Sequence, residues 1–214
     1  MRQDISMSLF LSTIDSTFSA PFIQRIRNLF STIDKAYAEA ARYYGFDCKG
    51  CDRICCEEFF CHYTLAEYMF LMHGLALLEQ EDKSALFRRA EEVKQWYRLH
   101  DAARQSERVM CPLNRNGFCV LYAYRPMICR LQGIPHLVKK PGQPLRRGPG
   151  CHVFNENIRM VPHADCGFDH TPFYTEMAAI EREIRNTLQY QDRYKKTVAD
   201  MLVDIRDAEK CSEW

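Results

Sequence analysis

Hydrophobic residues recur every three or four positions near the start of the chain, which is the period of one face of an α-helix. This stretch follows Ser19, Ala20 and Pro21, which suit the first turn of a helix, and Gly45 can end it in a left-handed conformation. The recurring apolar residues are Phe22, Ile26, Leu29, Phe30, Ile33, Tyr37 and Ala40. We therefore predict a long core-facing helix that leads directly into a group of cysteines.

Two more stretches with the helical period follow in the middle of the chain. Thr64 and Glu67 have the spacing of a capping box, and an amphipathic run continues from there to Leu78. A second stretch runs from Asp82 to about Arg104, with apolar residues on one face and many charges on the other. We expect the charged face to be solvated.

The end of the chain is also helical in its pattern. A helix is predicted to start at Thr171 and Pro172, and a further apolar run ends at Ile205. We expect both runs to pack on the first helix. Because 214 residues are enough for one sizeable core, we predict a single domain over residues 1–214. The predicted fold class is mainly α, a small helical domain with an irregular cysteine-rich metal-binding insert and one or two short strands.

The helical period disappears between about Glu107 and Cys166. Glycine, proline and cysteine set the pattern there, and a short strand is predicted over Phe118 to Tyr122. Such a long irregular region is unusual inside a compact domain unless something other than regular hydrogen bonding holds it. A metal centre would do that.

Composition places the chain among ordinary globular proteins, with 47% apolar residues, 27% charged residues and a net charge of +1. Asp4 and Asp15 interrupt the first twenty residues, unlike a signal peptide, and no apolar run approaches the roughly 18 residues of a membrane span. We expect a cytoplasmic protein with no membrane partner. In a reducing compartment, eleven cysteines indicate metal binding or redox chemistry rather than disulfides.

Eight cysteines lie in turn-rich sequence rather than on apolar faces, and we predict that they bind metal. They are Cys48, Cys51, Cys55, Cys56, Cys111, Cys119, Cys129 and Cys151. Cys48 and Cys51 have the spacing at which a tight turn aims two sulfurs at one metal. Since consecutive side chains point apart, either only one of Cys55 and Cys56 is a ligand, or the eight thiols serve two sites. Ordinary thiols are expected at Cys61, Cys166 and Cys211.

Thiolate ligands carry negative charge that needs compensation. Arg125 and Arg130 lie in a compact turn beside Cys129, and we predict that they donate hydrogen bonds to sulfur and so help to bind the cofactor. A second basic group, in a Pro/Gly-rich loop, lacks the interleaved aromatic residues of a nucleic-acid surface, so we expect a solvated loop and no nucleic-acid partner. Its residues are Lys139, Lys140, Arg146 and Arg147.

The cysteines and their neighbours stand in a specific order between about residues 45 and 155. The elements are Cys48-x2-Cys51-x3-Cys55-Cys56, Cys111-Pro112-Leu113, Gly117-Phe118-Cys119, Tyr124-Arg125-Pro126-Met127-Ile128-Cys129-Arg130 and Gly148-Pro149-Gly150-Cys151. This order resembles the YkgJ-type cysteine-cluster family, the CxxCxxCC proteins that are expected to chelate zinc or iron. The chain departs from the usual pattern by one extra residue between Cys51 and Cys55. The resemblance implies metal binding without an assigned reaction.

A more distant resemblance, to flagellin lysine-N-methylase, implies an iron–sulfur centre and methyl transfer. All-cysteine coordination suits both zinc and a [4Fe-4S] cluster. Because no His-x3-5-His pair accompanies the cysteines and Cys111-Pro112 is similar to the end of a ferredoxin-type run, we favour the [4Fe-4S] cluster over zinc. Two alternatives remain: a cluster-dependent redox or protein-lysine methyl-transfer enzyme with a protein substrate or redox partner, and a zinc-stabilised interaction module.

Overall fold

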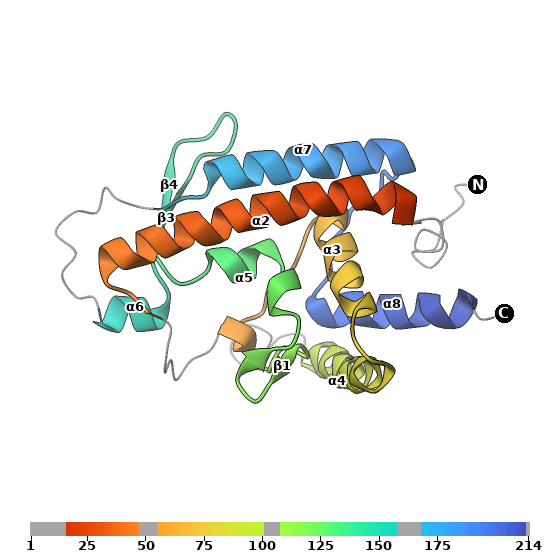
Figure 1. Cartoon of the computed structure of the whole chain (residues 1–214). Coiled ribbons are helices and arrows are strands. Elements are labelled where there is room, and N and C mark those ends of the chain that lie inside the picture. The colour runs from red at the N-terminus through yellow and green to blue at the C-terminus, as the bar shows by residue number, and fades with distance from the viewer. Residues whose placement is uncertain (1–15, 48–54, 101–107, 158–167, 213–214) are drawn as a thin grey trace.

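The computed structural model describes residues 16–47, 55–100, 108–157 and 168–212 (Figure 1). These residues are mainly helical with two small sheets, which confirms the predicted mainly-α fold with a few short strands. The helical elements are α2 (Ser16–Tyr44), η1 (Cys55–Glu57), α3 (Leu65–Ala76), α4 (Gln80–Leu99), η3 (Tyr122–Tyr124), α5 (Met127–Leu131), α6 (His152–Asn157), α7 (Thr171–Leu188) and α8 (Val198–Ser212). The strands are β1 (Asn114–Arg115), β2 (Phe118–Cys119), β3 (His136–Val138), β4 (Arg146–Gly148) and β5 (Phe168–Asp169).

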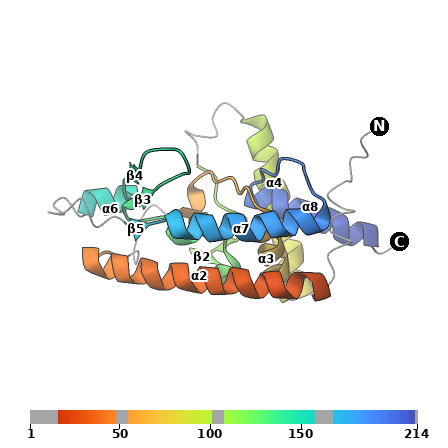
Figure 2. The same cartoon turned by 90° about the horizontal axis from the view of Figure 1, so that it is seen from above.

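Helix α2 forms one long side of the molecule, and α7 runs along it (Figures 1 and 2). The apolar stripe predicted from the sequence faces inward, because Ile26 and Ile33 are completely buried. Gly45 follows the helix with φ 62°, as predicted for a left-handed stop. The predicted start was wrong: the helix already includes Ser16, and Pro21 lies inside it. At this place a proline removes the hydrogen bond that the amide of residue 21 would donate to the carbonyl of residue 17, so α2 forms with one intrahelical bond fewer near its start.

Helix α3 is buried on nearly all sides and begins at the predicted capping box. The Thr64 hydroxyl accepts a hydrogen bond from the Glu67 amide at 3.2 Å and donates one to the Glu67 carboxylate at 2.7 Å. Near its end the helix approaches η3 closely, since a Cβ on Gly74 would lie 2.3 Å from Cγ of Tyr124. The absence of a side chain at residue 74 therefore allows α3 and η3 to pack together.

The last two helices have different partners. Helix α7 starts at Thr171 as predicted and packs on α2 and α3. Helix α8 packs against α4, so the expectation that both terminal runs cover the first helix was wrong for α8. A periodic apolar stripe predicts a buried face but not the helix that covers it, because any complementary stripe satisfies the same pattern.

A tight hairpin replaces most of the strand predicted over Phe118 to Tyr122. Strand β1 pairs antiparallel with β2, and Asn116 and Gly117 form the connection with φ values of 53° and 87°. Positive φ at both positions is the geometry of a two-residue hairpin turn, which the Asn-Gly pair favours. The chain then turns into the 3-10 helix η3, so β2 ends at Cys119.

The second sheet has the strand order β4-β3-β5, with β3 antiparallel to β4 and parallel to β5. One hydrophobic cluster includes buried residues of the helices α2, α3, α4, α5, α7 and α8. Within the described ranges, no helix combines the length and apolar character that crossing a bilayer requires.

Candidate metal centre

A cavity of about 550 Å³ lies beside the hairpin β1–β2, and five of the eight predicted ligands line it. They come from three segments that are far apart in the sequence. The lining cysteines are Cys55 and Cys56 of η1, Cys111 and Cys119 on the two sides of the hairpin, and Cys129 of α5. The fold thus collects cysteines spread over more than seventy residues around one space.

Backbone hydrogen bonds fix how these segments meet. The amide of Cys111 donates to the carbonyl of Cys56 at 2.7 Å, which holds η1 against the entry to the hairpin. The amide of Val120 donates to the carbonyl of Leu113 at 2.9 Å and closes the hairpin. These bonds place Cys56, Cys111 and Cys119 around the same turn.

Glu67 positions the third segment. Its buried carboxylate accepts a hydrogen bond from the amide of Met127 at 3.0 Å, at the first residue of α5. Burial alone would raise the pKa of Glu67, but His62, Thr64 and the Met127 amide together hold that pKa below its ordinary value. A carboxylate at a helix N-terminus is favourable, so α3 orients the short helix that carries Cys129.

Burial dominates the chemistry of the thiols. It raises the pKa of Cys111 to about 12, and the amide of Leu113, two residues further on, donates a hydrogen bond that opposes the increase. Burial also raises the pKa of Cys119, and the amide of Leu121 has the same opposing effect. Both amides thus stand where they would stabilise a thiolate.

The thiols also act on one another. Burial raises the pKa of Cys129 well above its ordinary value, and Cys111, Cys119 and Cys56 add to the increase. Like charges repel at short range, so four thiolates in this place would be costly without a cation among them. Cys56, Cys111, Cys119 and Cys129 are therefore treated together as the four-thiol group.

Cys55 and Cys56 have different surroundings, although both line the large cavity. Cys56 belongs to the four-thiol group, while Cys55 also lines a second cavity of about 30 Å³ together with Cys151. Cys151 precedes α6, and its sulfur accepts a hydrogen bond from the amide of Phe154 at 3.4 Å. Cys55 thus borders both cavities, and Cys56 is among the residues that line the larger one.

The structure does not place every cysteine named in the sequence analysis. Cys48, Cys51 and Cys166 are outside the described residues. Cys61 is described but is not among the residues that line the cavity. Within the described part of the chain, no three His, Cys, Asp or Glu residues are placed to hold a metal ion together. The structure therefore brings the thiols into one neighbourhood without assembling a coordination sphere.

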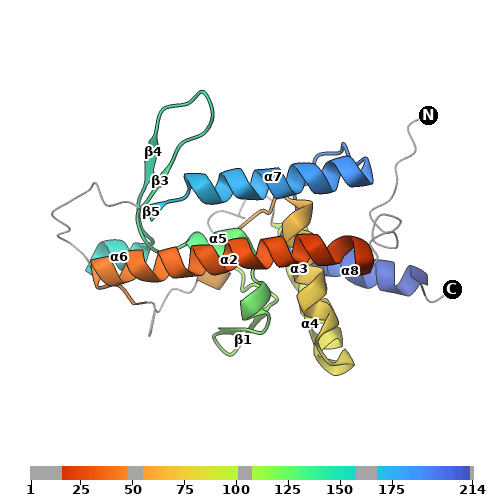
Figure 3. The ribbon, with the colours of Figure 1, turned by 45° about the horizontal axis from the view of Figure 1, so that its top comes forward.

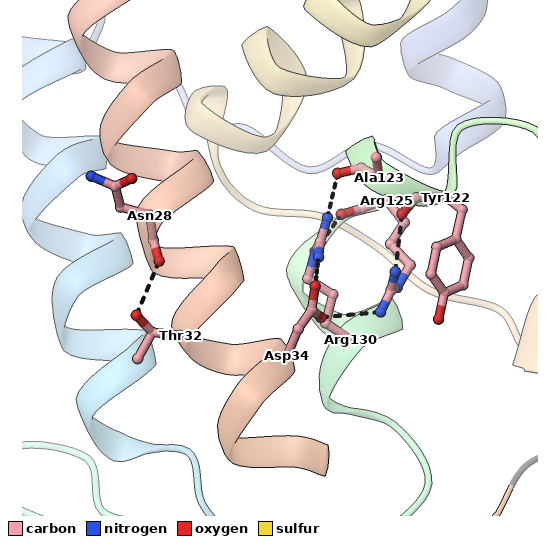
Figure 4. A network of polar contacts seen from close by, with 7 residues as sticks. All are labelled: Asn28, Thr32, Asp34, Tyr122, Ala123, Arg125 and Arg130. Carbon is pink, nitrogen blue, oxygen red and sulfur yellow. Dashed lines mark hydrogen bonds and ion pairs between the residues drawn. The ribbon is translucent and has the colours of Figure 1, made fainter.

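Arg125 and Arg130 also line the cavity, but their hydrogen bonds are to oxygen. Figure 4 shows both guanidinium groups on the carboxylate of Asp34 in α2. Arg130 also donates to the carbonyl of Ala123 at 2.6 Å, and Arg125 donates to the carbonyl of Tyr122 at 3.0 Å. Arg125 and Arg130 thus join the turn between η3 and α5 to α2. Because these two cations share one carboxylate, net positive charge remains near the thiols. Both arginines lower the pKa of Cys119 against the effect of burial.

Sequence reasoning missed Arg89, which approaches the site from α4. Its Nη1 donates to the carbonyl of Asn114 in β1, while its Nε and Nη2 are buried and have no hydrogen-bond partner among the described residues. Burial lowers the pKa of Arg89, and nearby Cys111 partly restores it. Arg89 is three residues after Leu86 and four before Val93, so it lies on the apolar side of the helix. This spacing is the sequence signal that Arg89 points toward the interior.

The distribution of charge along the chain is a second missed signal. Residues 108–155 contain eight Lys or Arg and no Asp or Glu, although the net charge of the whole chain is only +1. This segment carries four of the predicted cysteine ligands. A strongly basic segment would offset the negative charge of metal-bound thiolates.

No protein-family profile, curated protein or solved structure matches this chain. The resemblance to the YkgJ-type cysteine-cluster family therefore stays a prediction from the order of the cysteines and their neighbours.

Proposed function

We propose that this chain binds a metal centre, a [4Fe-4S] cluster in preference to zinc, through Cys56, Cys111, Cys119 and Cys129. The observation that supports the proposal is that these four thiols, from three separate segments, are electrostatic neighbours around one cavity. Both kinds of centre accept four cysteine ligands. The preference for the cluster rests on the sequence pattern, and so does the proposed membership of the YkgJ-type family.

The surroundings of the thiols fit a negatively charged thiolate site. Metal binding requires deprotonated cysteines, and a thiol with a raised pKa releases its proton to solvent only where a strongly bound cation replaces that proton on the sulfur. The amides of Leu113 and Leu121 and the guanidinium of Arg89 supply donors near the sulfurs. When bound, such a centre supplies a cross-link between η1, the hairpin and α5, or a group that accepts electrons.

The size of the cavity favours one second candidate, an enzyme that uses the centre for redox or group-transfer chemistry, such as protein-lysine methylation. A volume of about 550 Å³ lies within the range of small-molecule sites, whereas a closed four-thiolate site needs little space beyond its ligands. Apolar side chains also line the cavity, among them Val93, Tyr97 and Val198. These residues would exclude water from a molecule bound beside the centre.

Elemental analysis of protein purified without oxygen tests the proposal. We expect iron with acid-labile sulfide and absorption near ~400 nm for a cluster, or stoichiometric zinc without that absorption for the alternative metal. Cys129→Ser should lower both the metal content and the free energy of unfolding, because ligation and folding are coupled. Cys61→Ser, which changes a thiol outside the cavity, is the matched control and should keep its metal. Metal-free wild-type protein, or equal metal in both variants, would refute the assignment.

A further inference from the structure

The basic loop identified in the sequence is a projecting hairpin. Strands β3 and β4 pair in the register Leu137 with Arg147 and Val138 with Arg146, and the ribbon leaves the helical body beside α7 (Figures 1 and 3). Every residue from 139 to 147 is exposed. A two-stranded ribbon that projects in this way offers both of its faces to a partner.

The base of this hairpin is held firmly. The amide of His170 donates to the carbonyl of Leu137 at 2.8 Å, and the amide of Lys139 donates to the hydroxyl of Thr171 at 2.9 Å. Strand β3 also pairs with β5. The direction of the arm is therefore set by the sheet and by the start of α7.

Ion pairing divides the cations of residues 108–155 into two sets. Those near the cysteines pair with acidic residues of other elements: Arg108 with Glu57 and Glu58, Arg115 with Asp82, and Arg125 and Arg130 with Asp34. On the hairpin, Lys139, Lys140 and Arg146 have no ion-pair partner among the described residues. Arg147 is a further cation on the same arm. The uncompensated charge of the basic segment is thus concentrated on the hairpin.

The placement of the arginines decides which polyanion fits. Arg146 and Arg147 are consecutive in β4, so their side chains leave opposite faces of the ribbon. An acidic protein surface would meet only one face. The major groove of duplex DNA admits a two-stranded ribbon and presents phosphates on both walls.

We propose that the β3–β4 hairpin is a nucleic-acid-binding arm that enters a groove of duplex DNA and contacts phosphates through Lys139, Lys140 and Arg146, with Arg147 on the opposite face of the ribbon. The absence of interleaved aromatic residues argues against single-strand binding, in which bases stack on aromatic side chains. It does not argue against a duplex, which is bound through cations at its backbone. Leu145, which is 49% exposed directly before β4, adds an apolar contact in the groove. This inference is independent of the proposed metal centre.

Fluorescence anisotropy with a labelled duplex of about 20 base pairs and the whole chain tests the arm at several salt concentrations. Three phosphate contacts predict about a 40-fold loss of affinity between 50 and 200 mM salt. The double variant K140Q/R146Q should bind at least about tenfold more weakly at 50 mM salt, with a slope of log affinity against log salt reduced by about two. The charge-conserving variant K140R/R146K should bind like the wild type.

The matched control is R193Q/K195Q, which removes two exposed charges from the loop before α8 and should leave binding unchanged. An equal loss in this control would show a general charge effect and would overturn the proposal. Absence of duplex binding at 50 mM salt would also overturn it. Equal affinity for single-stranded DNA or for a poly-glutamate peptide would overturn the proposal as well.

Discussion

At the residue scale, Arg89 is the half-buried cation whose charge bears most directly on the four-thiol group. Arg89 has two buried donors without an acceptor, next to the turn in which the Asn114 amide donates to the carbonyl of Cys111 at 2.9 Å. Such orphaned donors are rare in folded proteins because each costs about 1–3 kcal/mol. A metal-bound Cys111 thiolate would place negative charge near the Arg89 guanidinium, which would offset part of the cost of burying it.

Replacing Arg89 should therefore weaken metal binding without removing a ligand. We expect Arg89→Met to lower the metal affinity by about 10-fold or more, as for other groups that orient metal ligands, while Arg89→Lys keeps the charge and loses less. Competition with a chromophoric chelator measures the affinity. Arg88→Met, which changes an exposed arginine of the same helix, is the control. Equal affinities in the variants of residues 88 and 89 would contradict this role.

At the scale of elements, α3 organises the neighbourhood of the cavity. It contacts η3 at Gly74, and its Glu67 carboxylate binds the first amide of α5. Both contacts involve elements of the cysteine-rich region, which has little regular structure of its own. The most buried helix thus positions the least regular segment.

A methyl group at residue 74 should disturb this arrangement. Glycine inside a helix normally costs about 1 kcal/mol relative to alanine, so propensity alone predicts that Gly74→Ala stabilises the protein. The clash with Tyr124 should dominate, because overpacking costs about 1–3 kcal/mol and the atoms concerned lie close to the tyrosine backbone. Urea denaturation should show a lower free energy of unfolding. In a Tyr124→Gly background, which also removes the tyrosine Cβ 2.6 Å away, the effect of Gly74→Ala should shrink or change sign; an unaltered effect there would argue against the clash.

At the scale of the whole molecule, a pair of stacked histidines links stability to pH. The rings of His136 and His170 lie 4.3 Å apart and nearly parallel, and join β3 to the segment that precedes α7. Burial lowers the pKa of His170 to about 3 and also lowers the pKa of His136. The folded protein therefore keeps both rings neutral where an unfolded chain would already be protonated.

Stability should fall as the pH falls from about 6.5 toward 3, because the unfolded state takes up protons that the folded state excludes. The slope can reach about 1.4 kcal/mol per pH unit for each histidine. Below pH 4.5, protonation of Glu67 adds to the loss, since its lowered pKa stabilises the folded protein only while it is ionised. Urea denaturation between pH 6.5 and 5 separates the histidines from the carboxylates. His170→Gln should have a shallower slope in that window, and a slope equal to that of the wild type would rule out the pair as the cause.

Short-range patterns were enough to predict much of the architecture. The apolar period of α2, the Thr64 capping box, the Gly45 stop and the start of α7 at Thr171 were all predicted from neighbouring residues. These features depend on local backbone geometry and hydrogen bonding, which a few consecutive residues determine. The hairpin at Asn116 and Gly117 belongs to the same class, although its signal was overlooked.

By itself the sequence determined the helices, the caps and the set of cysteines available for metal binding. Only the tertiary structure decided that α8 packs on α4, that Cys56 lies near Cys111, Cys119 and Cys129, and that Arg89 lies near Cys111. The structure also shows that the basic loop belongs to the projecting β3–β4 hairpin. The physical reason is distance along the chain. These contacts join segments tens of residues apart, and they form only where the buried faces of several elements fit together at once.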